Sequence, residues 1–303
     1  MTPSPANTFL LIPPWTDRAG RFSPLKFVVF LAVLAPAAWI VVEARHGWLG
    51  SRPVTEAIHQ SGLWAIRLLA ATLAVTPLRR ASRWSKLISV RRILGVSALA
   101  YAALHLGLYG LDQHFDLVQI GSEIARRIYL TIGFAAFCGL CALGATSTDG
   151  MIARLGGTAW GRLQQLVYPI AIVATVHFFI QSKLDVSEPI IMGGLFALLF
   201  GFRIADRRFG DLSLFGLIGL AFVSALATAV GEAFWYAVSI RAPLAIVLAA
   251  NFDFSYAVRP CWFVLGGGAI LCAARLMRPI WAVSGGGSPA TRRRMASVRP
   301  EIS

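Results

Sequence analysis

Long apolar runs recur along the chain, and short polar segments separate them. The runs lie at about residues 25–42, 62–78, 93–111, 128–146, 163–181, 189–205, 211–231 and 261–277. Most are close to or above the roughly 18 residues that a helix needs to cross a bilayer. The alternation of apolar and polar residues that indicates a half-buried strand is weak throughout. The pattern therefore predicts an all-α, polytopic transmembrane helix bundle of about eight spans.

One stretch, residues 232–258, does not follow this pattern. It mixes Glu232, Arg241 and Asp253 with short apolar patches. We expect either an interfacial helix or a re-entrant segment here, and the residues do not distinguish the two.

Composition agrees with the membrane class. Of the 303 residues, 57% are hydrophobic and 14% are charged, and the mean hydropathy is +0.67. A soluble domain carries about 25% charged residues, so that class is excluded.

The charge is strongly basic, with 28 Lys and Arg against 14 Asp and Glu. Most of the basic residues fall in alternate polar segments, which are cytoplasmic if the N-terminus is inside. Lys and Arg collect in cytoplasmic loops of membrane proteins, so the charge indicates topology and does not predict nucleic-acid binding. We expect a multi-pass protein of the bacterial inner membrane with both termini in the cytoplasm.

A single histidine, His105, lies deep inside the apolar run that follows Arg91 and Arg92. Ionisable residues inside membrane spans are costly and mark functional sites by default. His177 lies in the fifth run at a similar depth, toward the outer leaflet. Two histidines on facing helices can hold a haem iron, whereas the alternative is a buried neutral histidine that hydrogen-bonds across helices. His59, at the outer entrance of the second span, is a reserve ligand.

Four blocks of the sequence resemble the ferric-reductase-like transmembrane family. They are GLWAIRLLAATLAVTPLRR (62–80), RRILGVSALAYAALHLGLYGLD (91–112), TSTDGMIARLGGTAWGRLQQLVY (146–168) and the following span, which ends near His177. The resemblance covers about residues 55–205. Within the family, the chain looks most like the haem-binding membrane subunits of bacterial periplasmic methionine sulfoxide reductase systems.

The resemblance implies a b haem between the third and fifth spans, with His105 and His177 as its axial ligands. It implies that electrons enter from quinol or a cytoplasmic flavin donor and leave to a periplasmic, molybdopterin-containing reductase. FMN or a quinone is a further candidate cofactor. The chain itself would be an electron-transfer subunit, and whether it counts as an enzyme stays open. The family usually has a second histidine in the fifth span, where this chain has Gln164, so we expect one haem, in the outer leaflet.

Arginines supply the remaining candidates. Arg67 lies inside the second span and could either pair with a haem propionate or extend to the outer interface. Arg91 and Arg92, together with Arg79 and Arg80, form a basic rim that could bind an anionic donor such as a flavin phosphate. The alternative for this rim is positive-inside topology with lipid-phosphate contacts.

The expected organisation has four parts. They are a cytoplasmic leader (1–24), a six-span haem-binding core (25–210), a two-span extension (211–283) and a disordered basic cytoplasmic tail (284–303). Two other functions remain as alternatives. One is a ferric reductase or another haem-dependent membrane oxidoreductase, and the other is a transporter or scaffold without haem.

Overall fold

The computed structural model describes residues 13–17, 19–182 and 185–278. Within these residues the chain is helical and forms no strand, apart from one isolated bridge between Thr16 and Phe22. The all-α prediction is therefore confirmed. The predicted tail, 284–303, and the first half of the predicted leader lie outside the described residues. The elements are α1 (Pro24–His46), α2 (Pro53–Ser82), η1 (Ser85–Val90), α3 (Arg91–Asp112), α4 (Leu117–Arg126), α5 (Ile128–Ala145), α6 (Asp149–Leu155), α7 (Gly157–Leu163), η2 (Gln164–Leu166), α8 (Val167–Gln181), α9 (Ser187–Phe209), α10 (Leu214–Ile240), α11 (Leu244–Ala249), η3 (Ala250–Phe252) and α12 (Pro260–Leu276).

Seven helical segments of the described chain are long and apolar enough to cross a membrane. The eighth predicted span corresponds to α12, which has 17 residues and is a shorter apolar helix. The chain is thus a multi-pass membrane protein. Its described residues divide into two compact units, one made of the residues up to 72 with 89–182, the other of 73–88 with 185–278.

In the first unit, a proline and a tyrosine fix how α3 lies against α1. Pro36 lies inside α1, and a proline in a helix interior disrupts the local backbone hydrogen bonds. The Tyr101 hydroxyl of α3 enters this gap, because it donates to the Val33 carbonyl and accepts from the Ala37 N–H, both at 2.8 Å. Since His105 follows Tyr101 by four residues, this bond also fixes the helix face that carries His105.

The predicted fifth span is not one continuous α-helix. It consists of α7, the 3-10 turn η2 and α8, and Gln164 opens the 3-10 turn. Pro169 has no N–H to bond the Gln165 carbonyl, which is the kind of loss that interrupts a regular helix. The helix then continues through α8 and carries His177 near its end.

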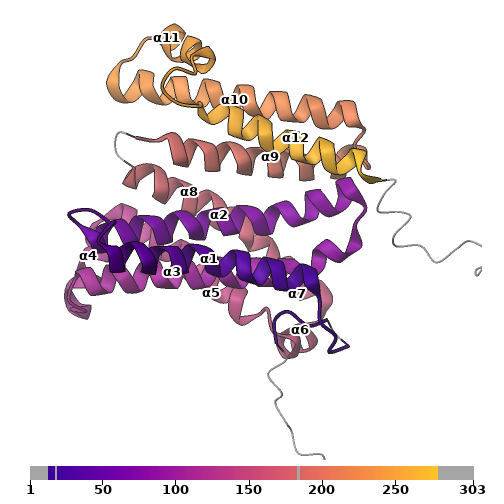
Figure 1. Ribbon diagram of the computed structural model, residues 1–303, viewed down its shortest axis with the longest axis horizontal. Coiled ribbons are helices and arrows are strands. Elements are labelled where there is room, and N and C mark those ends of the chain that lie inside the picture. Colours follow the sequence, from indigo (N-terminus) through magenta and orange to yellow (C-terminus); the bar gives the residue numbers. More distant parts are fainter. Residues whose placement is uncertain (1–12, 18, 183–184, 279–303) are drawn as a thin grey trace, which may run out of the picture. The chain divides into compact units, whose positions relative to one another are not determined.

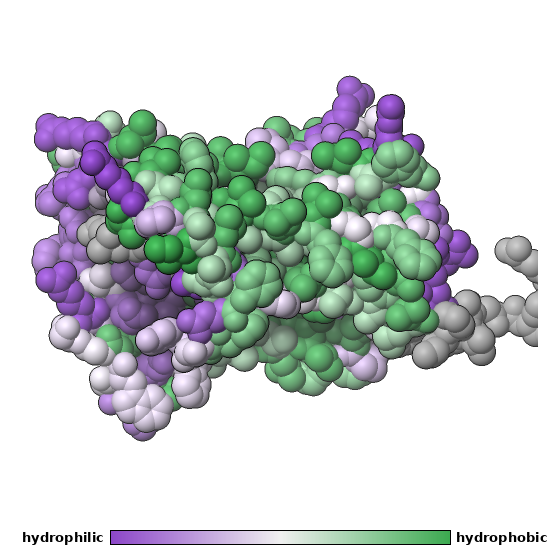
Figure 2. Space-filling model, turned by 90° about the horizontal axis from the view of Figure 1, so that it is seen from above, coloured by the Kyte–Doolittle hydropathy of each residue, from purple (hydrophilic) through white to green (hydrophobic). Residues whose placement is uncertain are grey.

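In the second unit, α9, α10 and α12 pack against one another (Figure 1). Their contact is the buried apolar cluster Leu198, Phe202, Leu217, Val264 and Leu271. The outward-facing side chains of α10 are apolar, and Figure 2 shows apolar residues over the sides of these helices and hydrophilic residues at their ends. This is the surface that a bilayer requires.

The stretch that the sequence left open, 232–258, has two parts. α10 continues to Ile240, so Glu232 lies inside a long helix and is completely buried. Residues 241–259 connect α10 to α12, and they include the six-residue helix α11. The Glu232 carboxylate accepts a hydrogen bond from Arg259, 27 residues later, at 3.3 Å.

Candidate functional site

His105 is held by the backbone of a neighbouring helix. Its Nδ1 atom lies 2.8 Å from the carbonyl oxygen of Ile58, in α2. A carbonyl oxygen can only accept a hydrogen bond, so Nδ1 carries the proton that it donates. In the neutral imidazole this leaves Nε2 with a free lone pair. The bond therefore fixes both the tautomer and the direction of the ring.

His177 is held in the same way by a different pair of helices. Its Nδ1 atom lies 2.8 Å from the carbonyl oxygen of Tyr129, in α5. The same argument places the proton on Nδ1 and leaves Nε2 as the acceptor atom. Histidines that bind metals almost always donate their other ring N–H to a carboxylate, a carbonyl or water. Both rings thus have the hydrogen-bond arrangement that is common in metal-binding histidines.

A glycine stands behind each imidazole. A Cβ atom added at Gly62 of α2 would lie 2.9 Å from His105 Nδ1, and one added at Gly133 of α5 would lie 2.7 Å from His177 Nδ1. Each glycine follows the accepting carbonyl by four residues, one helical turn along the same face. Only a residue without a side chain lets the imidazole approach this carbonyl. The two halves of the site therefore repeat one design.

The two rings meet inside the first unit. Their centres are 6.3 Å apart and their planes are at 83°. Two imidazoles that bind opposite sides of one iron through bonds of about 2 Å hold their ring centres roughly 6 Å apart. A porphyrin supplies the other four iron ligands, so two histidines are enough. On tautomer, ring separation and glycine clearance, this pair fits a haem.

The other residues that the sequence predicted for the site lie in α2 and α3. His59 is adjacent to Ile58 in α2 and its side chain is exposed. Arg67 lies near the middle of α2 with its guanidinium 5.2 Å from the centre of the Trp64 ring. Arg91 begins α3, and Arg92 forms an exposed ion pair with Asp149 at 2.6 Å. The structure thus brings His105 and His177 together, and places each arginine in a structural contact of its own or at a helix start.

Gln164 is the residue at which the resemblance led us to expect a second histidine. Its Nε2 atom lies 3.4 Å from the carbonyl oxygen of Leu143 and 3.3 Å from the Ser147 hydroxyl. An amide that donates to these two acceptors ties η2 to the end of α5. This is a structural role that requires no metal.

The sequence alone did not point to Gly62 and Gly133 or to the carbonyls of Ile58 and Tyr129. The glycines had a local signal, because glycine inside a helix is about 1 kcal/mol less favourable than alanine and usually has a packing reason. The carbonyls had none, since every residue carries one.

A match to a known protein family defines the class to which this protein belongs. Residues 61–175 match the family described as "Ferric reductase like transmembrane component". The matched segment contains Gly62, His105 and Gly133 and ends two residues before His177. The chain is therefore a ferric-reductase-like transmembrane protein.

Two similar proteins identify the family within this class. A protein of Xanthomonas campestris pv. campestris (strain 8004), named "Protein-methionine-sulfoxide reductase heme-binding subunit MsrQ", is 44% identical over 189 residues, 60% of this chain and 86% of the relative. A Rhodospirillum rubrum protein of the same name is 40% identical over 195 residues, 63% of this chain and 91% of the relative. This chain belongs to the MsrQ family of ferric-reductase-like membrane proteins. No solved structure matches it.

Proposed function

We propose that this chain is the haem-binding membrane subunit of a protein-methionine-sulfoxide reductase system, and that it carries electrons across the bacterial inner membrane. The observation that carries the proposal is the histidine pair. His105 and His177 come from different helices, each donates from Nδ1 to a carbonyl, and their ring centres are 6.3 Å apart. The name of the relatives supports the same role.

In this proposal the chain's residues orient and do not react. The carbonyls of Ile58 and Tyr129 hold the Nδ1 protons, so that both Nε2 atoms point their lone pairs at one metal position. When bound, a b haem supplies one-electron transfer. Gly62 in α2 and Gly133 in α5 leave room for each imidazole to lie against the helix that carries its accepting carbonyl. Arg67 is the candidate partner for a propionate.

The route of electrons belongs to the same proposal. Electrons enter from quinol or a cytoplasmic flavin donor, with FMN or a quinone as a further cofactor and Arg91 and Arg92 at the donor side. They leave to a periplasmic, molybdopterin-containing reductase. The basic residues favour cytoplasmic termini, and we assign the haem to the core, 25–210, with 211–283 as an extension.

A visible spectrum of the purified protein tests the proposal. We expect a Soret band in the wild-type protein that is lost in His105→Ala and in His177→Ala. His59→Ala, at the reserve ligand, and His114→Ala, at an exposed histidine that follows α3, are matched controls that should keep the band. A wild-type protein without haem, or full haem in both ligand variants, would disprove the assignment. A pyridine haemochrome assay should give one haem per chain.

A further inference from the structure

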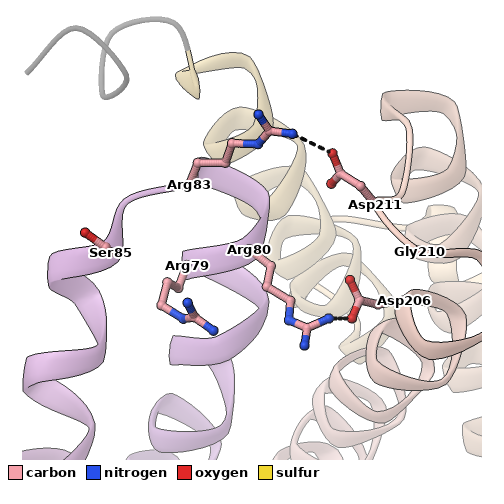
Figure 3. A pocket seen from close by; sticks show the side chains of 7 residues that line it. All are labelled: Arg79, Arg80, Arg83, Ser85, Asp206, Gly210 and Asp211. Carbon is pink, nitrogen blue, oxygen red and sulfur yellow. Dashed lines mark hydrogen bonds and ion pairs between the residues drawn. The ribbon is translucent and has the colours of Figure 1, made fainter. Parts of the chain in front are cut away.

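An arginine-lined pocket lies in the second unit, away from the histidine pair in sequence. It has a volume of about 440 Å³ and lies where the end of α2 and the start of η1 meet the turn between α9 and α10 (Figure 3). Gly210 ends α9 with a φ of +78°, and the Ser213 hydroxyl accepts from the Gly216 N–H to begin α10. The residues that line the pocket are Arg79, Arg80, Arg83, Ser85, Asp206, Gly210 and Asp211.

The two carboxylates of the pocket are already paired. Asp206 forms an ion pair with Arg80, and Asp211 forms one with Arg83 at 3.3 Å. Asp211 also accepts from Arg275 at 2.8 Å and from Arg278 at 2.5 Å. These hydrogen bonds, that of Arg278 foremost, hold the pKa of Asp211 well below its usual range, so it is ionised at neutral pH. Four arginines thus pair with two carboxylates and Arg79 adds a fifth positive charge, so the cluster has an excess of positive charge.

Arg79 is the arginine that the carboxylates do not reach. Its Nε atom is buried and has no hydrogen-bond partner among the described residues. Figure 3 shows its guanidinium beside Arg80, with no bond to either aspartate. A buried N–H of a charged group that lacks an acceptor carries a free-energy cost of several times RT. Arg79 Nε is therefore a donor without a protein acceptor among the described residues, and the excess positive charge of the cluster favours an anion at this place.

The donors in the pocket match a phosphoryl group. Guanidinium groups bind phosphate oxygens through paired, charge-assisted hydrogen bonds. The hydroxyl of Ser85 supplies a further donor on the wall formed by η1. A carboxylate holds its two oxygens in one plane, whereas the tetrahedral phosphorus of a phosphodiester directs its two anionic oxygens and its two ester oxygens toward different walls. We propose that this pocket binds a phosphoryl group, and that its source is the headgroup of an anionic phospholipid.

The neighbouring side chains favour a lipid over a free phosphate. Phe209, next to Gly210, is 78% exposed, and Phe215, in the first turn of α10, is 84% exposed. Ile88, in the same 3-10 helix as Ser85, is 48% exposed. Large apolar side chains at helix ends beside a basic pocket suit acyl chains below a bound headgroup. A soluble phosphate would make no use of them.

Native mass spectrometry of the full-length protein in detergent tests the proposal. Phosphatidylglycerol is titrated, with phosphatidylcholine and inorganic phosphate in separate arms. Arg79→Gln should weaken phosphatidylglycerol binding about tenfold or more, since it removes a charge-assisted hydrogen bond. Arg79→Lys should recover only part of it, because an ammonium has no planar fork. Size-exclusion profiles show that each variant is folded.

Arg208→Gln is the matched control. It removes the same charge near the end of α9, and Arg208 is exposed and does not line the pocket. Phosphatidylglycerol binding that falls in Arg79→Gln and stays in Arg208→Gln supports the proposal. Equal loss in both variants, or equal binding of phosphatidylcholine, overturns it. Tighter binding of inorganic phosphate than of phosphatidylglycerol, sensitive to Arg79, overturns the lipid source and keeps the phosphoryl chemistry.

Discussion

The two units of this protein stabilise polar side chains by opposite means. In the first unit, His105 and His177 are neutral in the assigned tautomer, and backbone carbonyls that are fixed in helices satisfy them. In the second unit, charged side chains pair with one another. Glu232 pairs with Arg259, and Asp211 at the arginine-lined pocket pairs with Arg275 and Arg278. A carbonyl in a helix is rigid, whereas ion pairs between long side chains are adaptable and sensitive to the loss of one partner. The first means suits a precise metal position, and the second suits holding helix ends together.

Breaking the buried ion pair should give the largest effect. Glu232 is completely buried and Arg259 is 35% exposed. Removing one partner of a buried pair costs about 3–5 kcal/mol, and we expect the low end for Arg259→Leu because its side chain is partly solvated. The midpoint of thermal unfolding in detergent measures this loss.

The double variant Glu232→Leu with Arg259→Leu separates charge from packing. Replacing both partners by apolar residues is often neutral, so it should recover most of the midpoint lost by Arg259→Leu. A double variant as unstable as the single one would show that the pair matters by shape and not by charge.

Filling the space behind an imidazole should have the next largest effect. In Gly133→Ala, the added methyl group lies against His177 Nδ1 and pushes the ring from the Tyr129 carbonyl. Loss of a group that orients a metal ligand typically lowers metal affinity by 10–100-fold, so haem content per chain should fall. Gly219→Ala is the control, because a Cβ there meets nothing within 4 Å. Undiminished haem in Gly133→Ala would remove the glycine from the site.

Asp211→Asn should have a smaller, pH-dependent effect. The folded-state pKa of Asp211 is lowered, first by the hydrogen bond from Arg278. Its contribution is therefore fully present above the unfolded value of about 3.9 and declines as the pH falls below it toward the folded pKa. Because the side chain is 48% exposed, we expect roughly 1 kcal/mol after screening.

Thermal midpoints of Asp211→Asn and the wild-type protein between pH 7 and pH 3 make this measurable. The difference should be constant above about pH 5 and shrink on acidification below about pH 4. A difference that grows on acidification has the wrong sign for an ionised Asp211.

Gln164→Leu should change least. The Gln164 amide makes two long hydrogen bonds, at 3.3 and 3.4 Å, and a typical one contributes about 1 kcal/mol or less. Haem per chain should be the same as in the wild-type protein. A halved haem content would mean that Gln164 supports a second haem, and the one-haem proposal would fail.

Much of this fold could be predicted from local patterns in the sequence. The apolar runs alone predicted the helices, since a helix that crosses a bilayer satisfies its own backbone and needs only length and hydrophobicity. The matched depth of His105 and His177 also followed from counting residues along two spans. The exception was Glu232, where a polar residue suggested the end of a span, although α10 continues past it.

The tertiary structure decided which atoms meet. The carbonyls of Ile58 and Tyr129, the clearance at Gly62 and Gly133, and the joining of Arg278 to Asp211 all depend on how helices are rotated against one another. That rotation results from packing between segments far apart in the chain, such as the hydrogen bonds of the Tyr101 hydroxyl to Val33 and Ala37 beside Pro36 of α1. The sequence predicted that two histidines reach a similar depth, and only the packed helices determined that each donates from Nδ1 to a carbonyl and that their ring centres lie 6.3 Å apart.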